Sequence, residues 1–347
     1  MKKTVKHATL ILLLFLFVSG SLLMFLFYKS DFPKSKKLLN RDAQHQLTGT
    51  LFYGNASLDA IKAFTLSSKG LAINHESYQS YTEGFLTQVH QQQLLEHINA
   101  YRKSQGLLPI SYFYQYIQDD RYAFISLSEG LNTLYIINLK TYEVKTPHFD
   151  CSEAKDRQYI YHIQKGQDVY YVLSAVANSY EAHLYALDPS NDFSLHPLLS
   201  YTTAPSAISS NQYALDAQGR AYFVAERAID VVNLEGTLSL DLPFSPSYLL
   251  YEHDTLYALG LSEHTLYYQS FNASLEKLTS GELSLPNRGV SFVDGFIEED
   301  LLYTLTFDAS HPLYRNYITV YDLKTHRMGY CLALYSYKDM APLALQK

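Results

Sequence analysis

The chain has 347 residues, a formal net charge of −7 and a sequence pI near 6.0. A nucleic-acid-binding protein would need a clustered basic face, and a net negative charge gives no support for one, so this class is excluded. Aromatic residues make up 14% of the chain, as 32 Tyr and 18 Phe with no Trp. Tyrosine suits half-buried sheet positions, which points to a protein rich in β-strands.

A long apolar run follows a short basic tail at the N-terminus. Residues 8–27 carry no charged side chain, and Lys2, Lys3 and Lys6 precede them. At a rise of about 1.5 Å per residue, such a helix crosses a hydrocarbon core of about 30 Å. We therefore expect residues 1–7 to be a cytoplasmic tail and residues 8–28 to be a transmembrane signal anchor. A cleaved signal peptide is the alternative, since Val18-Ser19-Gly20 could satisfy a small-residue cleavage rule.

The basic tail also predicts the orientation of the chain in the membrane. A short basic segment before a first apolar helix stays in the cytoplasm, and a large following domain is translocated largely regardless of its charge. The expected localisation is thus the cell membrane, with a single pass and the main domain on the extracytoplasmic side. Residues 29–46, which include Pro33 and several lysines, are expected to form a juxtamembrane stalk.

One hairpin pattern recurs six times along the rest of the chain. In residues 134–144 an alternating strand reaches a polar corner at Asn138 and a second strand follows. The first interval, from Thr65 to Asn138, spans 73 residues, and the others lie near 40 to 50 residues, the period of propeller blades. The six corners are small, polar and able to bond their own backbone: Thr65, Asn138, Asp188, Asn233, Ser270 and Asp322.

A second repeated element supports the same fold. Polar turns precede strands that open on an aromatic residue, as at Tyr122, Tyr170, Tyr222, Tyr257 and Tyr303. Each repeat then reads turn, strand, loop, strand, corner, strand, which predicts an all-β, six-bladed β-propeller over residues 47–347. A β-sandwich is the alternative fold, and seven blades are the alternative count.

The two ends of the predicted propeller suggest how the ring closes. The first blade lacks a strand at its front, and residues 341–345 can supply it beside residues 47–53. The long first interval contains apolar residues at three- and four-residue spacings between residues 82 and 105. This spacing predicts one inserted amphipathic helix, which ends near Gly106.

No catalytic or metal-binding motif is found in the sequence. His90, Glu96 and His97 share a helix face but lack the His-Glu-x-x-His spacing of zinc peptidases. Cys151 and Cys331 are four blades apart in the predicted ring, so two free thiols are expected. We expect no metal and no cofactor, and the absence of a motif favours a binding module over an enzyme.

Candidate binding residues come from the loops between the second and third strands of the blades. These loops emerge on one face of a propeller, and loops held by a rigid scaffold often carry binding residues. The residues are Glu129, Asn132, Asn178, Tyr180, Glu181, Glu226, Arg227, Glu263, His264, His311, Tyr314, Arg315 and Asn316.

The repeats at residues 134–144 and 318–328 resemble the hairpins of YVTN-type, quinoprotein-like and TolB-like propellers. The resemblance covers the chain from about residue 47 to the C-terminus and concerns the fold only. These families include scaffolds, assembly factors and some enzymes, so they imply no single function. The chain has no Trp and no cofactor-binding constellation, so the resemblance does not extend to a quinone cofactor.

Together these patterns predict a membrane-anchored, extracytoplasmic propeller that binds a protein or a cell-envelope glycan, with a monomeric soluble domain. The alternative is a carbohydrate-active hydrolase or lyase that uses the loop carboxylates Glu129, Glu226 and Glu263 as acid and base. A shared pocket holding two of these carboxylates would favour the enzyme. Carboxylates spread around the rim would favour the binding module.

Overall fold

A computed structural model describes most of the propeller and part of the N-terminal region. It describes residues 15, 17–21, 35–40, 47–55, 61–81, 84–127, 133–149, 158–176, 181–202, 212–287, 290–310, 314–335 and 340–347. Within these ranges no helix has both the length and the apolar character needed to cross a bilayer. The predicted anchor at residues 8–28 lies outside them, apart from a helical turn at residues 15 and 17–21.

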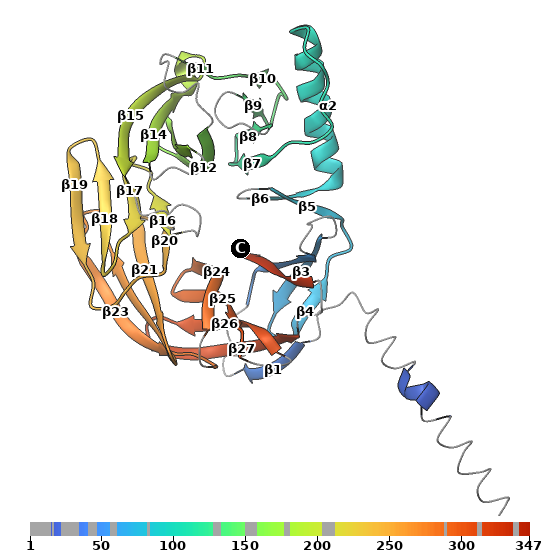
Figure 1. Cartoon of the computed structure of the whole chain (residues 1–347), viewed down its shortest axis with the longest axis vertical. Coiled ribbons are helices and arrows are strands. Elements are labelled where there is room, and N and C mark those ends of the chain that lie inside the picture. Colours follow the sequence, from blue (N-terminus) through green and yellow to red (C-terminus); the bar gives the residue numbers. More distant parts are fainter. Residues whose placement is uncertain are drawn as a thin grey trace, which may run out of the picture.

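Six antiparallel blades form a ring, as the repeats predict (Figure 1). In chain order, blade 2 has β7 (Gln115–Gln118), β8 (Tyr122–Ser126), β9 (Leu134–Asn138) and β10 (Val144–Lys145); blade 3 has β12 (Gln158–Lys165), β13 (Tyr170–Val176), β14 (Glu181–Asp188) and β15 (Ser194–Thr202); blade 4 has β16 (Tyr213–Leu215), β17 (Ala221–Val224), β18 (Ala228–Asn233) and β19 (Gly236–Asp241); blade 5 has β20 (Tyr248–Glu252), β21 (Thr255–Ser262), β22 (Thr265–Phe271) and β23 (Lys277–Ser284); blade 6 has β24 (Val290–Glu298), β25 (Leu301–Asp308), β26 (Tyr314–Asp322) and β27 (Arg327–Tyr335).

Blade 1 joins the two ends of the propeller in one sheet. The C-terminal strand β28 (Met340–Gln346) is its innermost strand, followed by β2 (Thr50–Asn55), β3 (Ile61–Ser67) and β4 (Gly70–Ile73). Strand β28 pairs with β2 along its length, from Thr50 opposite Gln346 to Asn55 opposite Met340. The predicted closure is therefore confirmed.

Alternation along the strands places apolar side chains between neighbouring blades, because successive residues point to opposite faces of a sheet. One such layer packs Leu51 and Phe64 of blade 1 against Leu305 and Ile318 of blade 6. Similar layers join blades 2 and 3, 3 and 4, 4 and 5, and 5 and 6. The core of the propeller thus consists of interfaces between blades.

The interface between blades 1 and 2 is different, because an insertion lies inside it (Figure 1). The insertion consists of β5 (Tyr78–Tyr81), β6 (Gly84–Thr87) and the helix α2 (Gln88–Ser104). Phe85 of β6 stacks on Phe52 of blade 1 with ring centroids 3.8 Å apart. On the other side, Leu94 and Ile98 of α2 pack against blade 2. The hairpin and helix therefore take the place of direct contact between these blades.

The inserted helix begins later than the sequence predicts. Its N-cap is Thr87, whose side chain accepts a hydrogen bond from the backbone N–H of His90. Residues 84–87, which the helical spacing included, form strand β6 instead. The insertion is a two-stranded hairpin followed by a helix, so it does not form the alternative seventh blade.

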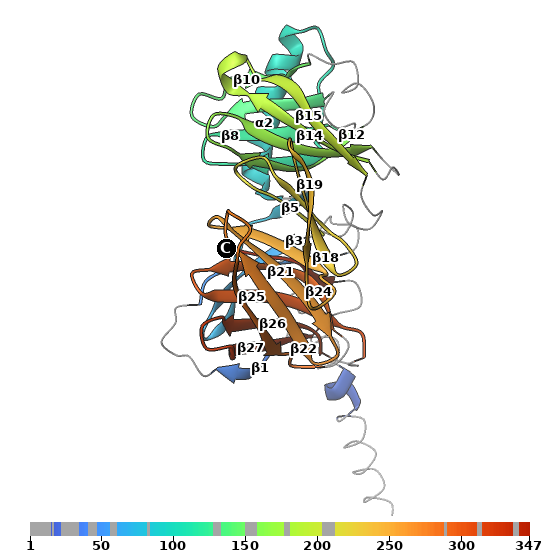
Figure 2. The same ribbon diagram turned by 90° about the vertical axis from the view of Figure 1, so that its left-hand side faces the viewer.

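Part of the predicted stalk belongs to the propeller. Strand β1 (Ser35–Asn40) pairs with β27 and becomes a fifth strand at the outer edge of blade 6 (Figure 2). The Lys37 ammonium also donates to the carbonyl of Ser68 in blade 1, at 2.6 Å. The linker interpretation of residues 29–46 therefore missed a strand at residues 35–40. Two short elements complete the described structure, β11 (His148–Phe149), parallel to β15, and a 3-10 turn at Pro189–Asn191.

Candidate binding site

Five of the predicted site residues have described side chains on one face of the ring. Glu226 and Arg227 lie in the turn between β17 and β18, Glu263 and His264 lie between β21 and β22, and Arg315 follows the start of β26. All five are exposed. These connections join second and third strands, so they share one end of the blades, which we call the loop face.

For most of the other predicted residues, the structure does not describe the side chain. Glu129, Asn132, Asn178, Tyr180 and His311 are outside the described residues, and the side chain of Tyr314 is not described. Glu181 begins β14, where it is exposed, and Asn316 is buried within β26. Asn316 is thus part of the sheet core and was wrongly assigned to the loop.

The described loop-face residues do not form one constellation. Arg227 donates a hydrogen bond from Nη2 to the carbonyl of Pro243 at 2.6 Å, which secures its own blade. Glu226 and Glu263 lie in exposed turns of different blades and line neither of the two cavities described below. Among the described residues, no group of three or more His, Cys, Asp or Glu side chains is arranged to hold a metal ion.

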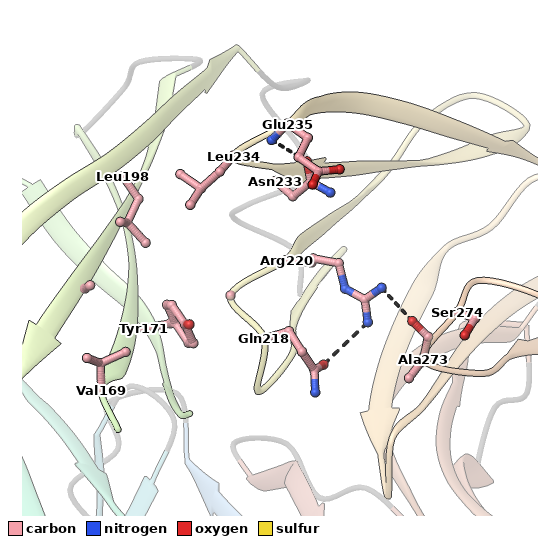
Figure 3. A pocket seen from close by; sticks show the side chains of 12 residues that line it. Val169, Tyr171, Leu198, Gln218, Arg220, Asn233, Leu234, Glu235, Ala273 and Ser274 are labelled. Atoms are coloured by element: carbon pink, nitrogen blue, oxygen red, sulfur yellow. Dashed lines mark hydrogen bonds between the residues drawn. The ribbon is translucent and has the colours of Figure 1, made fainter. Parts of the chain in front are cut away.

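A cavity lies at the end of the blades opposite the loop face, and we call this end the turn face. It is a cavity of about 510 Å³ between blades 3, 4 and 5, within the range of about 300 to 1,000 Å³ for small-molecule sites (Figure 3). Its walls come from strands of blade 3 and from turns that join first to second strands and third to fourth strands. We call it the turn-face cavity.

A buried carboxylate organises one wall of this cavity. Asp216 is fully buried and accepts hydrogen bonds from the backbone N–H groups of Gln218 and Arg220, at 2.9 and 2.8 Å. Arg220 Nε donates to its other oxygen at 2.5 Å, and the Tyr222 hydroxyl donates to the same oxygen at 2.7 Å. Burial, and then the bond to this carboxylate, raise the pKa of Tyr222. Four donors therefore fix a buried charge that would otherwise be strongly unfavourable.

Arg220 also links two blades across the cavity. Its Nη1 donates to the carbonyl of Ala273 in blade 5 at 2.6 Å, and Nη2 lies 3.4 Å from the Gln218 side-chain oxygen (Figure 3). The guanidinium is thus engaged on each of its nitrogens by blades 4 and 5. It serves as a fixed part of the wall.

Two glycines leave the space that the aromatic ring of Tyr171 occupies beside the cavity. A Cβ at Gly166 would lie 2.7 Å from the Tyr171 ring, and a Cβ at Gly219 would collide with the same ring. Gly219 also has a φ of +80°, which favours glycine. The absence of side chains at both positions lets Tyr171 lie flat between two turns, facing the cavity.

The hairpin tip of blade 4 supplies the outer edge of the cavity. Asn233 Oδ1 accepts hydrogen bonds from the backbone of Glu235 and Gly236, which fixes the turn. This turn exposes Leu234, whose exposed fraction is 72%. An apolar wall of Val169, Tyr171, Leu198 and Leu234 therefore faces a polar wall that contains Arg220 and Glu235 (Figure 3).

A second cavity, of about 460 Å³, is lined by the inner strands of blades 2 to 5. Lys165 lies on it and bonds Asp120 at 2.7 Å, with Asp119 at 3.8 Å. Its tyrosine Tyr248 donates to Asp294 of blade 6 at 2.8 Å. Burial raises the pKa of Asp294, and hydrogen bonds, the first from the Leu345 N–H, oppose that shift. These polar groups tie inner strands together.

The turn-face residues were missed because short polar turns look alike in a sequence. The sequence pattern identified residues 218–220 only as a turn that precedes Tyr222 and Asn233 only as a corner, and it did not include Asp216. The exposed Leu234 directly after that corner was an available signal, because an apolar side chain at a hairpin tip cannot be explained by strand alternation.

Comparisons with known proteins find similarity to solved structures at low sequence identity. No protein-family model matches the sequence, and no curated protein matches it. Among solved structures, the chain is similar to Kluyveromyces lactis Hsv2, at 10% identity over 61% of each chain with a TM-score of 0.41. It is similar to Porphyromonas gingivalis dipeptidyl peptidase 4, at 13% identity over 80% of this chain and 36% of the other, with a TM-score of 0.40.

TolB from Acinetobacter baumannii is a further similar structure, at 8% identity over 86% of this chain and 67% of TolB, with a TM-score of 0.39. The expected propeller fold is confirmed by the six blades of the structure itself. The match spans less than two thirds of the Hsv2 and dipeptidyl peptidase 4 chains. At these identities the likeness extends to the fold alone.

Proposed function

We propose that this chain is a membrane-anchored, extracytoplasmic propeller that binds a protein or a cell-envelope glycan. The observation that carries the proposal is the turn-face cavity, in whose described lining the one arginine, Arg220, is already bound by blades 4 and 5. A cavity with one apolar and one polar wall suits recognition, since apolar burial supplies affinity and fixed polar groups supply specificity.

Membrane anchoring is supported by the apolar side chains near the N-terminus. Phe15, Phe17 and Val18 have exposed fractions of 69%, 76% and 55%. Exposure of adjacent large apolar residues is unfavourable in water, whereas a bilayer would cover them. Together with the basic tail, this favours a helix in the membrane and the propeller on the extracytoplasmic side.

Strand β1 supports a particular orientation of the propeller. Ser35 lies opposite Leu334 near the end of β27, so the chain enters β1 from the loop face. Tyr28 and Ser35 are seven residues apart, which limits the span between the anchor and blade 6 to about 25 Å. The loop face of blade 6 would thus lie near the membrane, and the turn-face cavity would open away from it.

Labelling of an introduced cysteine tests the topology. Ser239 lies on β19, where it is exposed, so a Ser239→Cys, Cys151→Ser chain presents one accessible thiol besides the buried Cys331. A membrane-impermeant maleimide should label it in intact cells. Labelling that appears only after lysis would contradict the extracytoplasmic assignment and would favour a cytoplasmic propeller.

Turnover assays separate binding from carbohydrate cleavage. The purified full chain should retain cell-envelope glycan or a partner protein without releasing new reducing ends. Release of reducing ends that Glu226→Gln or Glu263→Gln abolishes would establish the hydrolase and refute a purely binding role.

A further inference from the structure

The two charged side chains that line the described part of the turn-face cavity differ in how free they are to bind a ligand. Arg220 is bonded to Asp216, Ala273 and Gln218, so an anionic ligand would have to compete with three existing acceptors. Its charge is also balanced by the fully buried Asp216 carboxylate. The cavity therefore offers little attraction to an anion.

Glu235 is the other charged residue in the described part of the lining, where its carboxylate has no partner. The residue is exposed, and only its backbone N–H is bonded, to Asn233 Oδ1 at 2.8 Å. Among the described residues, no hydrogen bond or ion pair reaches its carboxylate. One uncompensated negative charge therefore stands at the edge of the cavity.

An apolar wall leads from the interior to this charge. Tyr171, Leu198 and Leu234 line the cavity on the side of the blade 3 strands and the blade 4 hairpin tip (Figure 3). Lysine and arginine have long apolar stems that pack on such surfaces while the charged head remains in water or meets a carboxylate.

We infer that the turn-face cavity binds a lysine or arginine side chain from a basic segment of a partner protein. The stem would pack against Tyr171 and Leu234, and the charged head would pair with Glu235. The net charge of −7 would favour encounter with a basic partner. This inference rests on the proposed binding function and assigns it a partner chemistry.

Peptide fluorescence gives a direct test, because the chain has no Trp. The full chain in detergent is titrated with a capped peptide of one Trp, two Leu and three Lys, and with a matched peptide that has Glu for Lys. The Lys peptide should bind and the Glu peptide should not. Glu235→Gln should weaken binding about fivefold, the effect expected for one exposed charge pair.

Matched variants distinguish the cavity from general attraction. Glu263→Gln makes the same charge change on the loop face and should leave affinity unchanged. Leu234→Ser should weaken binding, whereas Leu238→Ser, at an exposed position of β19 outside the cavity lining, should not. Spermidine, which has charge but no apolar side chain, should compete poorly.

Three results would overturn the inference: equal losses in Glu235→Gln and Glu263→Gln, preference for the Glu peptide, or full competition by spermidine. The proposed function has a separate readout in the maleimide topology and in glycan or partner retention. Retention by the Glu235→Gln chain, with no binding of the Lys peptide by the unaltered chain, would leave the proposed function intact and refute the basic-segment site.

Discussion

Leu51 of β2 lies opposite Leu345 of β28, and both are buried in the layer between blades 1 and 6. A single pair of strands thus joins the two ends of the propeller. The same strand β28 donates the Leu345 backbone N–H to the half-buried Asp294 of blade 6 at 2.8 Å. Closure therefore depends on sheet pairing, apolar packing and one partly buried hydrogen bond at the same place.

Leu345→Ala should destabilise the whole propeller. The side chain is 1% exposed, and removal of a buried leucine typically costs about 2 to 5 kcal/mol of unfolding free energy. Denaturant unfolding of the full chain measures the loss. Leu238→Ala, at an exposed position, should change stability by less than about 0.5 kcal/mol. Equal stability of the two variants would mean that β28 contributes nothing to closure.

The sequence predicted the blades well because the alternation of side chains between the two faces of a strand is still recognised when a turn is misplaced by two residues. Four corners are where the pattern placed them, and Asn138 and Asp322 each accept two backbone hydrogen bonds there. Thr65 and Ser270 were wrong, since they lie inside β3 and β22. The polar residues of those turns, Ser67 and Asn272, come two positions later. A shift of two residues keeps every side chain on the same face, so alternation cannot detect it.

The insertion and the turn-face cavity depend on contacts that no local pattern contains. Phe85 fits a helical spacing in the sequence, but it stacks on Phe52 from another blade. Arg220 reads as a turn residue, yet its partners are Asp216 and a carbonyl of the next blade. The packing of distant segments determines both, and a period in the sequence reports only neighbouring residues.

Asp216→Asn should destabilise blade 4 more than most polar substitutions. The change leaves Arg220 without its ion pair and presents an amide N–H₂ to donors at a fully buried site. Loss of one partner of a buried ion pair typically costs about 3 to 5 kcal/mol. Thermal unfolding, followed by the near-ultraviolet signal of the tyrosines, measures the change.

Tyr222→Phe is the matched control for Asp216→Asn. It removes one of the four donors and keeps the charge pair, so the expected loss is about 1 kcal/mol. If Tyr222→Phe lowered the unfolding free energy as much as Asp216→Asn, the Tyr222 hydroxyl and not the ion pair would be the main stabilising group. Unchanged stability of Asp216→Asn would show that the carboxylate charge is not needed in this wall.

Strand β1 covers the buried cysteine of blade 6. Leu39 lies opposite Cys331 in the β1–β27 ladder and packs on the cluster of Tyr317, Cys331 and Ala333. Burial raises the pKa of the Cys331 thiol to about 11. Because the thiolate is the reactive form, the thiol should react slowly at neutral pH. The folded pKa lies above its ordinary value, so the neutral thiol persists up to about pH 11.

Replacement of residues 35–40 by a six-residue Gly-Ser segment should expose this thiol while it preserves the chain length. In a Cys151→Ser background, iodoacetamide should label Cys331 slowly, with a rate that still rises between pH 8 and 10 instead of levelling near pH 9. Without β1 the rate should increase at every pH, and β27, as a new sheet edge, should promote association on size exclusion. Lys36→Ala changes an exposed side chain of β1 and should alter neither the labelling rate of Cys331 nor the association state. Equal labelling with and without β1 would mean that the strand does not cover Cys331 in solution, and blade 6 would then end at β27.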